Sequence, residues 1–209
     1  MRTLLLIAVT LVLSAAAFGQ TPAPQAAPQP CTLRIDRAPV VRGVKLGMSV
    51  DDLLALFPGS AEKVGIQETL KKSKEYPNFG VFGLSLMPRE YPTKDRFEGI
   101  RTLEVQFVDG AITDFRVNYY FPPQGPSWPR LDDFITKVAA AYRLPPATDW
   151  TREQYQVAEK SLKCDGFRVD ASNLNLAGSM AVSRPERAFT TRSARQEEFE
   201  EKVRQSFKP

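Results

Sequence analysis

Two acidic residues, Glu104 and Asp114, have the residue type and spacing best suited to chemistry in this chain. They lie in the two arms of a predicted β-hairpin over 101–121, whose turn contains Asp109 and Gly110. A three-residue loop with Gly110 in a left-handed bulge would place the two carboxylates directly opposite each other. An opposed pair raises the pKa of one carboxyl group for acid–base catalysis, or it holds a cation.

The same residues also fit a non-catalytic interpretation. In this register Arg116 lies diagonally from Glu104 and neutralises it in water. Tyr120 is predicted to point away from the core on the same polar side, and exposed aromatic residues are common in protein–protein contacts. We therefore predict a candidate interaction face made of Glu104, Asp114, Arg116 and Tyr120, and we assign no catalytic residue, metal ligand or cofactor.

The composition excludes several classes of enzyme. The 209 residues contain no histidine, which removes Ser-His-Asp and Cys-His catalysis and zinc sites that use histidine. The sequence has no Gly-x-Ser-x-Gly elbow, no phosphate-binding glycine loop and no dinucleotide fingerprint. The net charge of +4 comes from scattered lysines and arginines, so we expect no nucleic-acid partner.

The N-terminus predicts export. Arg2, an apolar run over 4–16 and small residues before Gln20 have the pattern of a signal peptide, which we assign to 1–19. The run is too short for a membrane anchor, so we predict no transmembrane segment in the mature chain. Residues 20–30 are rich in proline, alanine and glutamine and form an extended linker. We expect a periplasmic or secreted protein.

The chain has two cysteines, Cys31 and Cys164. In an exported protein two cysteines most simply form a disulfide, and we predict that pairing. The alternative is two buried free thiols.

Two segments have the pattern of amphipathic helices. In 50–57 the apolar residues follow the spacing i, i+3, i+4 and i+7, and Ser49 and Asp52 form a capping box. The pattern returns at 131–138, with Ser127 as a candidate N-cap. The polar insertion 60–78 between helix and strands is predicted to be a solvated loop or a short helix.

Strand-like segments follow each helix, which predicts an α+β fold: an antiparallel sheet with helices packed on one face. A single domain over 31–185 would contain two related helix-plus-hairpin halves, at about 41–121 and 127–185. In the second hairpin a two-residue turn, Asp165-Gly166, would place Cys164 beside Phe167.

The C-terminal tail, 186–209, is charged and predicted to be helical. Ser193 and Gln196 form a possible capping box, and Phe199, Val203 and Phe207 make a narrow apolar stripe. We expect this stripe to pack against the domain rather than against a partner.

The stretch 41–59, VRGVKLGMSVDDLLALFPG, resembles the opening motif of the small outer-membrane assembly lipoproteins of the BamE/SmpA type, which continue to a hairpin like LEVQFVDGAI. The apparent duplication is similar to the tandem repeats of the secreted β-lactamase-inhibitor proteins. These resemblances imply an exported α+β domain with a concave binding sheet, and they assign no site residues.

We predict an exported, non-catalytic binding or scaffold protein of the bacterial cell envelope, which binds an envelope protein through its exposed sheet face. One alternative is a carboxylate-dependent hydrolase or lyase that uses Glu104 and Asp114. Another is a carrier of a small apolar ligand held between the helices and the sheet.

Overall fold

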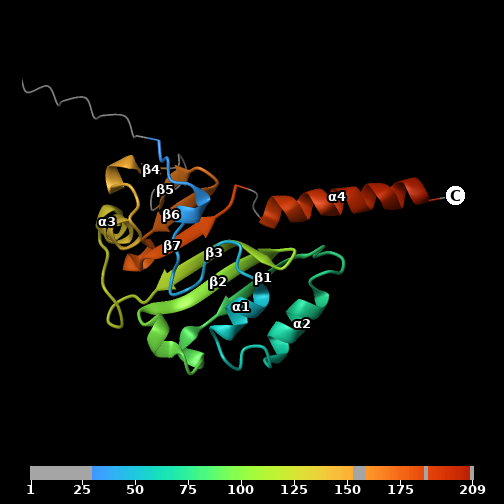
Figure 1. Cartoon of the computed structure of the whole chain (residues 1–209), viewed down its shortest axis with the longest axis horizontal. Helices are drawn as coiled ribbons and strands as arrows, with labels where there is room; N and C mark the ends of the chain where they lie inside the picture. The colour runs from blue at the N-terminus through green and yellow to red at the C-terminus, as the bar shows by residue number, and fades with distance from the viewer. Residues whose placement is uncertain (1–29, 153–158, 186–187, 208–209) are drawn as a thin grey trace, which may run out of the picture.

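A computed structural model describes residues 30–152, 159–185 and 188–207 (Figure 1). The predicted signal peptide and nearly all of the linker lie outside the described residues. Within these residues the fold is α+β, as predicted, with a seven-stranded antiparallel sheet. The helices are α1 (Val50–Ala55), α2 (Val64–Lys72), α3 (Leu131–Tyr142) and α4 (Ala188–Ser206), and the strands are β1 (Val81–Leu86), β2 (Ile100–Val108), β3 (Ala111–Tyr119), β4 (Thr151–Arg152), β5 (Glu159–Cys164), β6 (Phe167–Ser172) and β7 (Ser179–Ser183).

Two meanders form the sheet, in the strand order β1-β2-β3-β7-β6-β5-β4. They meet where β3 pairs with β7, with Phe115 opposite Val182 and Val117 opposite Met180. This junction joins both meanders into one sheet with one core. The duplication of a helix-plus-hairpin unit stays a prediction.

One face of the sheet is apolar and buried. The residues that oppose one another along one row of it, from β1 to β5, are Leu84, Val105, Phe115, Val182, Val169 and Leu162. All are buried and belong to a single hydrophobic cluster. Because side chains alternate along each strand, the residues next to this apolar row in each strand point to the other face.

The helix α1 has the predicted cap. The hydroxyl of Ser49 accepts a hydrogen bond from the Asp52 backbone N–H (3.1 Å) and donates one to the Asp52 carboxylate (2.8 Å). Leu53 and Leu54 are buried in the core, and the Phe57 ring, just past the helix, stacks on Phe97 with the centroids 4.6 Å apart. The acidic pair of this helix therefore serves capping and the helix dipole.

The insertion 60–78 contains α2, the short helix that was one of the two expected outcomes. It lies beside the edge strand β1 (Figure 1), and Ile66 and the half-buried Leu70 pack against the core. Its basic residues lie at the C-terminal end, where the helix dipole favours positive charge.

The helix α3 forms as predicted, but its predicted cap is wrong. The N-cap position is Arg130, whose side chain makes no capping hydrogen bond and instead donates to the Asp133 carboxylate at 2.7 and 2.9 Å. Ser127 lies too far before the first helical turn to cap it. The neighbouring Asp132 forms an ion pair with Lys160 of β5 at 2.6 Å.

The first hairpin differs from the prediction in its register. Asp109 and Gly110, both with positive φ (51° and 82°), form a two-residue turn, so Val108 pairs with Ala111. A bulge in β3 then shifts the pairing by one residue, since Phe107 pairs with Ile112 but Gln106 pairs with Asp114. The bulge does what the expected three-residue loop would have done: it places the odd-numbered apolar residues of both strands on one face.

The second hairpin is as predicted, with Cys164 opposite Phe167. Cys164 forms a disulfide with Cys31, as expected from the sequence. The segment after Cys31 is also held at this turn, because the backbone N–H of Asp165 donates to the Leu33 carbonyl at 3.0 Å. The disulfide therefore fastens the N-terminal segment to the β5–β6 turn.

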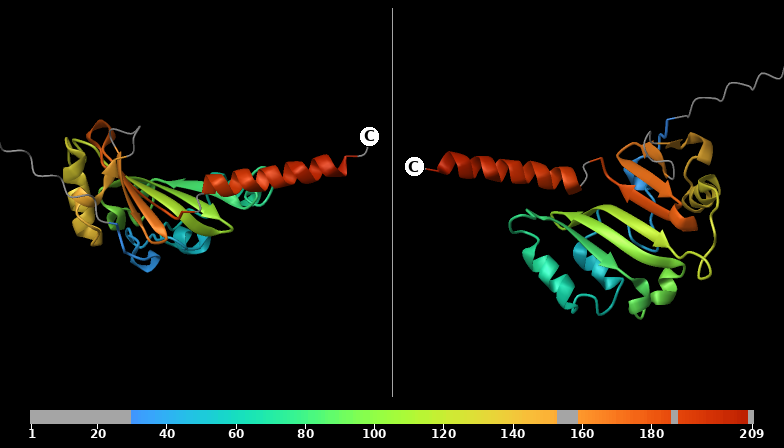
Figure 2. Two further views of the ribbon diagram at one scale, coloured as in Figure 1. Left: turned by 90° about the horizontal axis from the view of Figure 1, so that it is seen from above. Right: turned by 180° about the vertical axis from the view of Figure 1, so that it is seen from behind.

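The helix α4 contacts the sheet near its start and extends well beyond it (Figure 2). Arg192 donates to the Val81 carbonyl at 3.1 Å, and the Phe199 ring lies 5.5 Å from the rings of Tyr76 and Phe79. Val203 and Phe207 are 51% and 76% exposed, so only the first part of the predicted stripe packs on the domain. The predicted cap at Ser193 is wrong, because this residue lies inside the helix.

Candidate functional site

The second face of the sheet, called here the polar face, carries hydrophilic side chains across the strands. One row of opposed residues on it, from β1 to β4, is Ser85, Glu104, Arg116, Ala181, Asp170, Ser161 and Thr151. It runs beside the apolar row described above. Glu104, Gln106 and Arg116, at the centre of the polar face, are exposed.

The predicted pairing of two carboxylates on this face is wrong. Glu104 lies opposite Arg116, and Asp114 lies opposite Gln106, because the bulge in β3 shifts the register. Asn118 donates to the Glu104 carboxylate at 3.1 Å, and Thr113 donates to the Asp114 carboxylate at 2.9 Å. Each carboxylate thus has its own partners, and the two carboxylates do not oppose each other.

The second half of the chain adds a hydrogen-bonded group that the sequence analysis missed. Arg168 donates to the Ser161 hydroxyl at 2.6 Å, and that hydroxyl donates to the Asp170 carboxylate at 2.6 Å. Arg168 and Asp170 also form an ion pair directly. All three are half-buried or buried, unlike the exposed residues at the centre of the face.

Tyr120, the fourth predicted residue of the face, lies one residue past the end of β3 and is half-buried. It lines a pocket with Met87, Arg101 and Gln124 at that end of the sheet. The structure therefore brings Glu104 and Arg116 together, holds Asp114 one row away, and places Tyr120 at the margin of the face.

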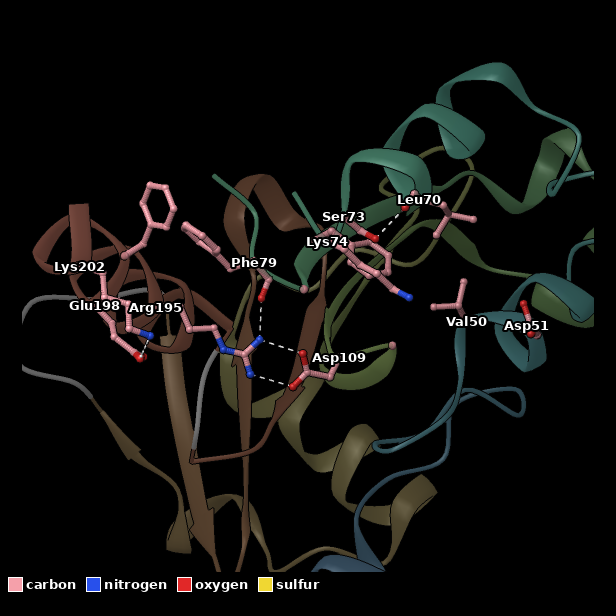
Figure 3. Close-up of a pocket in the computed structure, with 14 residues that line it drawn as sticks. Val50, Asp51, Leu70, Ser73, Lys74, Phe79, Asp109, Arg195, Glu198 and Lys202 are labelled. Atoms are coloured by element: carbon pink, nitrogen blue, oxygen red, sulfur yellow. Dashed lines mark hydrogen bonds and ion pairs between the residues drawn. The ribbon is translucent and has the colours of Figure 1, made fainter. Parts of the chain in front are cut away.

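A groove lies between α4 and the rest of the domain (Figure 3). Its volume is about 1000 Å³. Its apolar lining comes from α1, α2, β1 with the residues just before it, and α4, and consists of Val50, Leu70, Phe79, Phe82 and Phe199. Charged residues alternate with these, including Lys74, Glu198 and Lys202. We call this the α4 groove.

An arginine clamp forms part of the lining of the α4 groove (Figure 3). Arg195 binds both oxygens of the Asp109 carboxylate, at 2.8 and 2.7 Å, and donates to the Phe79 carbonyl at 2.6 Å. The hydrogen bonds from Arg195 lower the pKa of Asp109, and the same bonds raise the pKa of Arg195. Sequence analysis could not find this pair, because its members are 86 residues apart.

Two further features, a metal-binding cluster and a membrane-spanning helix, are absent from the described part of the chain. No group of three or more Cys, Asp and Glu residues there is arranged to hold a metal ion. None of the helices described is both long and apolar enough to cross a membrane.

Comparison with models of protein families, with curated proteins and with solved structures gave no match for this chain. The polar face, the α4 groove and the disulfide are therefore the features of the chain that bear on its function.

Proposed function

We propose that this chain is an exported, non-catalytic binding or scaffold protein of the bacterial cell envelope, which binds a protein partner through the polar face. The observation that carries the proposal is the exposed centre of this face, where Glu104 and Arg116 oppose each other on neighbouring strands. Exposed charges of both signs on a rigid sheet give specificity and steer association with a partner of complementary charge.

Export is supported by two features. The disulfide between Cys31 and Cys164 requires an oxidising compartment to persist, and the bacterial periplasm is one. The signal-peptide pattern over 1–19 is the second feature. The resemblance of 41–59 to envelope lipoproteins of the BamE/SmpA type belongs to the same proposal.

Binding is favoured over catalysis by the arrangement of the carboxylates. The hydrolase or lyase alternative depended on a Glu104–Asp114 pair, and these residues face Arg116 and Gln106 instead. A wholly apolar ligand is also a poor fit to the α4 groove, because burying Lys74, Glu198 and Lys202 beside it would cost free energy.

The proposal is tested with a charge-neutral double variant, Glu104→Gln/Arg116→Gln. Glu104→Gln keeps the shape of the side chain, and Arg116→Gln keeps a shorter polar side chain. The net charge of the protein stays the same, and the new amide oxygen at position 104 can still accept from Asn118. Envelope fractions of the native bacterium are passed over the immobilised wild-type protein and the variant, and the retained proteins are identified by mass spectrometry.

The matched control is Glu62→Gln/Lys71→Gln, another charge-neutral pair at exposed positions near α2. We expect a partner that the wild-type protein and the control retain and the polar-face variant loses. Equal retention by all three proteins would contradict binding through this face.

A further inference from the structure

A pocket separate from the α4 groove lies on the polar face, where β3 and β6 end and β7 begins. Its volume is about 450 Å³. The lining residues are Arg101, Arg116, Asn118, Tyr119, Phe121, Ser172, Leu174, Ala177, Gly178 and Ser179. We call this the Arg101 pocket.

A β-bulge places Arg101 in this pocket. Ile100 pairs with Tyr119 and Thr102 pairs with Asn118, so Arg101 has no cross-strand partner. Regular alternation would have put this odd-numbered residue on the apolar face with Leu103. The bulge instead redirects its side chain, which is exposed and lies over the Phe121 ring, 5.7 Å from its centroid.

The pocket has two guanidinium groups and no acidic residue in its lining. Among the residues described, neither Arg101 nor Arg116 has a carboxylate oxygen within ion-pair distance. Glu104 lies opposite Arg116 on the neighbouring strand, but its carboxylate makes no ion pair with Arg116 and accepts from Asn118 instead. Two unpaired cations on one concave surface attract an anion, and arginine binds carboxylates through paired hydrogen bonds.

The other walls of the pocket suit an apolar group. Phe121 and Leu174 are 43% and 66% exposed, which leaves apolar surface uncovered at its rim. Ala177, Gly178 and Ser179 form part of the lining, and these small residues leave the space open. The Ser172 and Ser179 hydroxyls bond to each other at 2.7 Å, so one of the two O–H groups already has a partner.

We propose that the Arg101 pocket binds a carboxylate that is attached to an apolar group. Arg101 and Arg116 hold the carboxylate, and Phe121 and Leu174 cover the apolar part. The carboxylate belongs either to a small organic acid or to the end of a peptide chain, which share this chemistry. The proposal does not depend on the proposed envelope partner, because the isolated protein is expected to bind either form.

Isothermal titration calorimetry of the purified mature protein tests this with three probes: octanoate, octanamide, and a short peptide ending in Leu-Leu with a free carboxylate. The protein variants are Arg101→Gln and Arg116→Gln, which keep long polar side chains. The control is Arg152→Gln, which removes another exposed arginine of the same sheet, on the opposite edge strand β4.

We expect at least one of the two carboxylates to bind the wild type and the control, and octanamide to bind neither. Each pocket variant should weaken binding about tenfold, since a lost hydrogen bond to a charged group is worth about that factor. The tighter of the two carboxylate probes identifies the source of the ligand. No binding of either carboxylate at millimolar concentration, or equal binding by the pocket variants, would overturn the proposal.

Discussion

Replacing Arg195 with methionine should release α4 from the sheet. The substitution keeps the apolar stem and removes three hydrogen bonds, two to the Asp109 carboxylate and one to the Phe79 carbonyl. Because the side chains of Arg195 and Asp109 are 34% and 64% exposed, solvent screens the pair and the loss is far below that of a buried ion pair. We expect the docking of α4 to weaken by about 1–2 kcal/mol.

That free energy corresponds to a roughly 5- to 30-fold larger population of undocked helix. A polar helix of 19 residues is only marginally stable without tertiary contacts, so undocking should expose its amides to exchange. Hydrogen exchange measured by mass spectrometry should therefore show faster exchange in peptides from α4, with little change in β5 and β6.

The matched control is Arg204→Met in the same helix. Arg204 pairs only locally with Glu201, at 2.8 Å, and makes no contact with the sheet among the hydrogen bonds of the described residues. Equal exchange in the Arg195→Met and Arg204→Met proteins would refute the argument that Arg195 fastens α4.

Three more predictions concern pH, the disulfide and the core. Arg195 lowers the pKa of Asp109, so the clamp is complete above the unfolded pKa of about 3.9 and is lost as the pH falls through the lower folded pKa. The protection factors of the α4 amides, which compare observed with intrinsic exchange at the same pH, should therefore fall at that acidic end in the wild type and change less in Arg195→Met. Equal pH dependence of protection in the two proteins would contradict the clamp. The Cys31→Ser/Cys164→Ser protein should lose about 2–5 kcal/mol of unfolding free energy. The disulfide joins residues 133 apart and so restricts the unfolded chain strongly. A thermal unfolding midpoint equal to that of the oxidised wild type would contradict this. Phe107→Ala should lower the free energy of unfolding, measured by urea denaturation, by about 3–5 kcal/mol. Phe107 is fully buried and stacks on Phe82 with the ring centroids 4.9 Å apart. A loss below about 1 kcal/mol would show that the core is not packed as described.

Local patterns predicted much of the fold. The cap of α1 followed from Ser49 and Asp52, because capping depends on residues three positions apart. The second hairpin followed from a two-residue turn and alternating apolar residues, which placed Cys164 beside Phe167. The predicted disulfide needed only two cysteines and an export signal.

The register of the first hairpin was not predictable in the same way. A three-residue loop and a two-residue turn followed by a bulge leave the same apolar residues on the same face, so burial pattern alone does not separate them. The choice between them decides whether Glu104 faces Asp114 or Arg116. The position of Arg101 was not predictable from alternation either. Alternation assigns this odd-numbered residue to the apolar face, but a second bulge, between Ile100 and Thr102, turns its side chain away from that face.

Other parts of the site depend on contacts between distant segments. The Arg195–Asp109 clamp and the α4 groove form only when the C-terminal helix meets the first hairpin. The Arg168, Ser161 and Asp170 group depends on the pairing of β5 with β6 and has no spacing motif of its own. For α3, the expected serine cap was replaced by a local Arg130–Asp133 pair.

In-cell photo-crosslinking at the centre of the polar face tests the central claim most directly. A photo-reactive amino acid replaces the exposed Gln106 in one strain and the exposed Glu62, on the helical side, in another. We predict a discrete crosslinked envelope protein at position 106 and none at position 62. No crosslinked product at 106, or the same products at both positions, would contradict a binding role for the polar face.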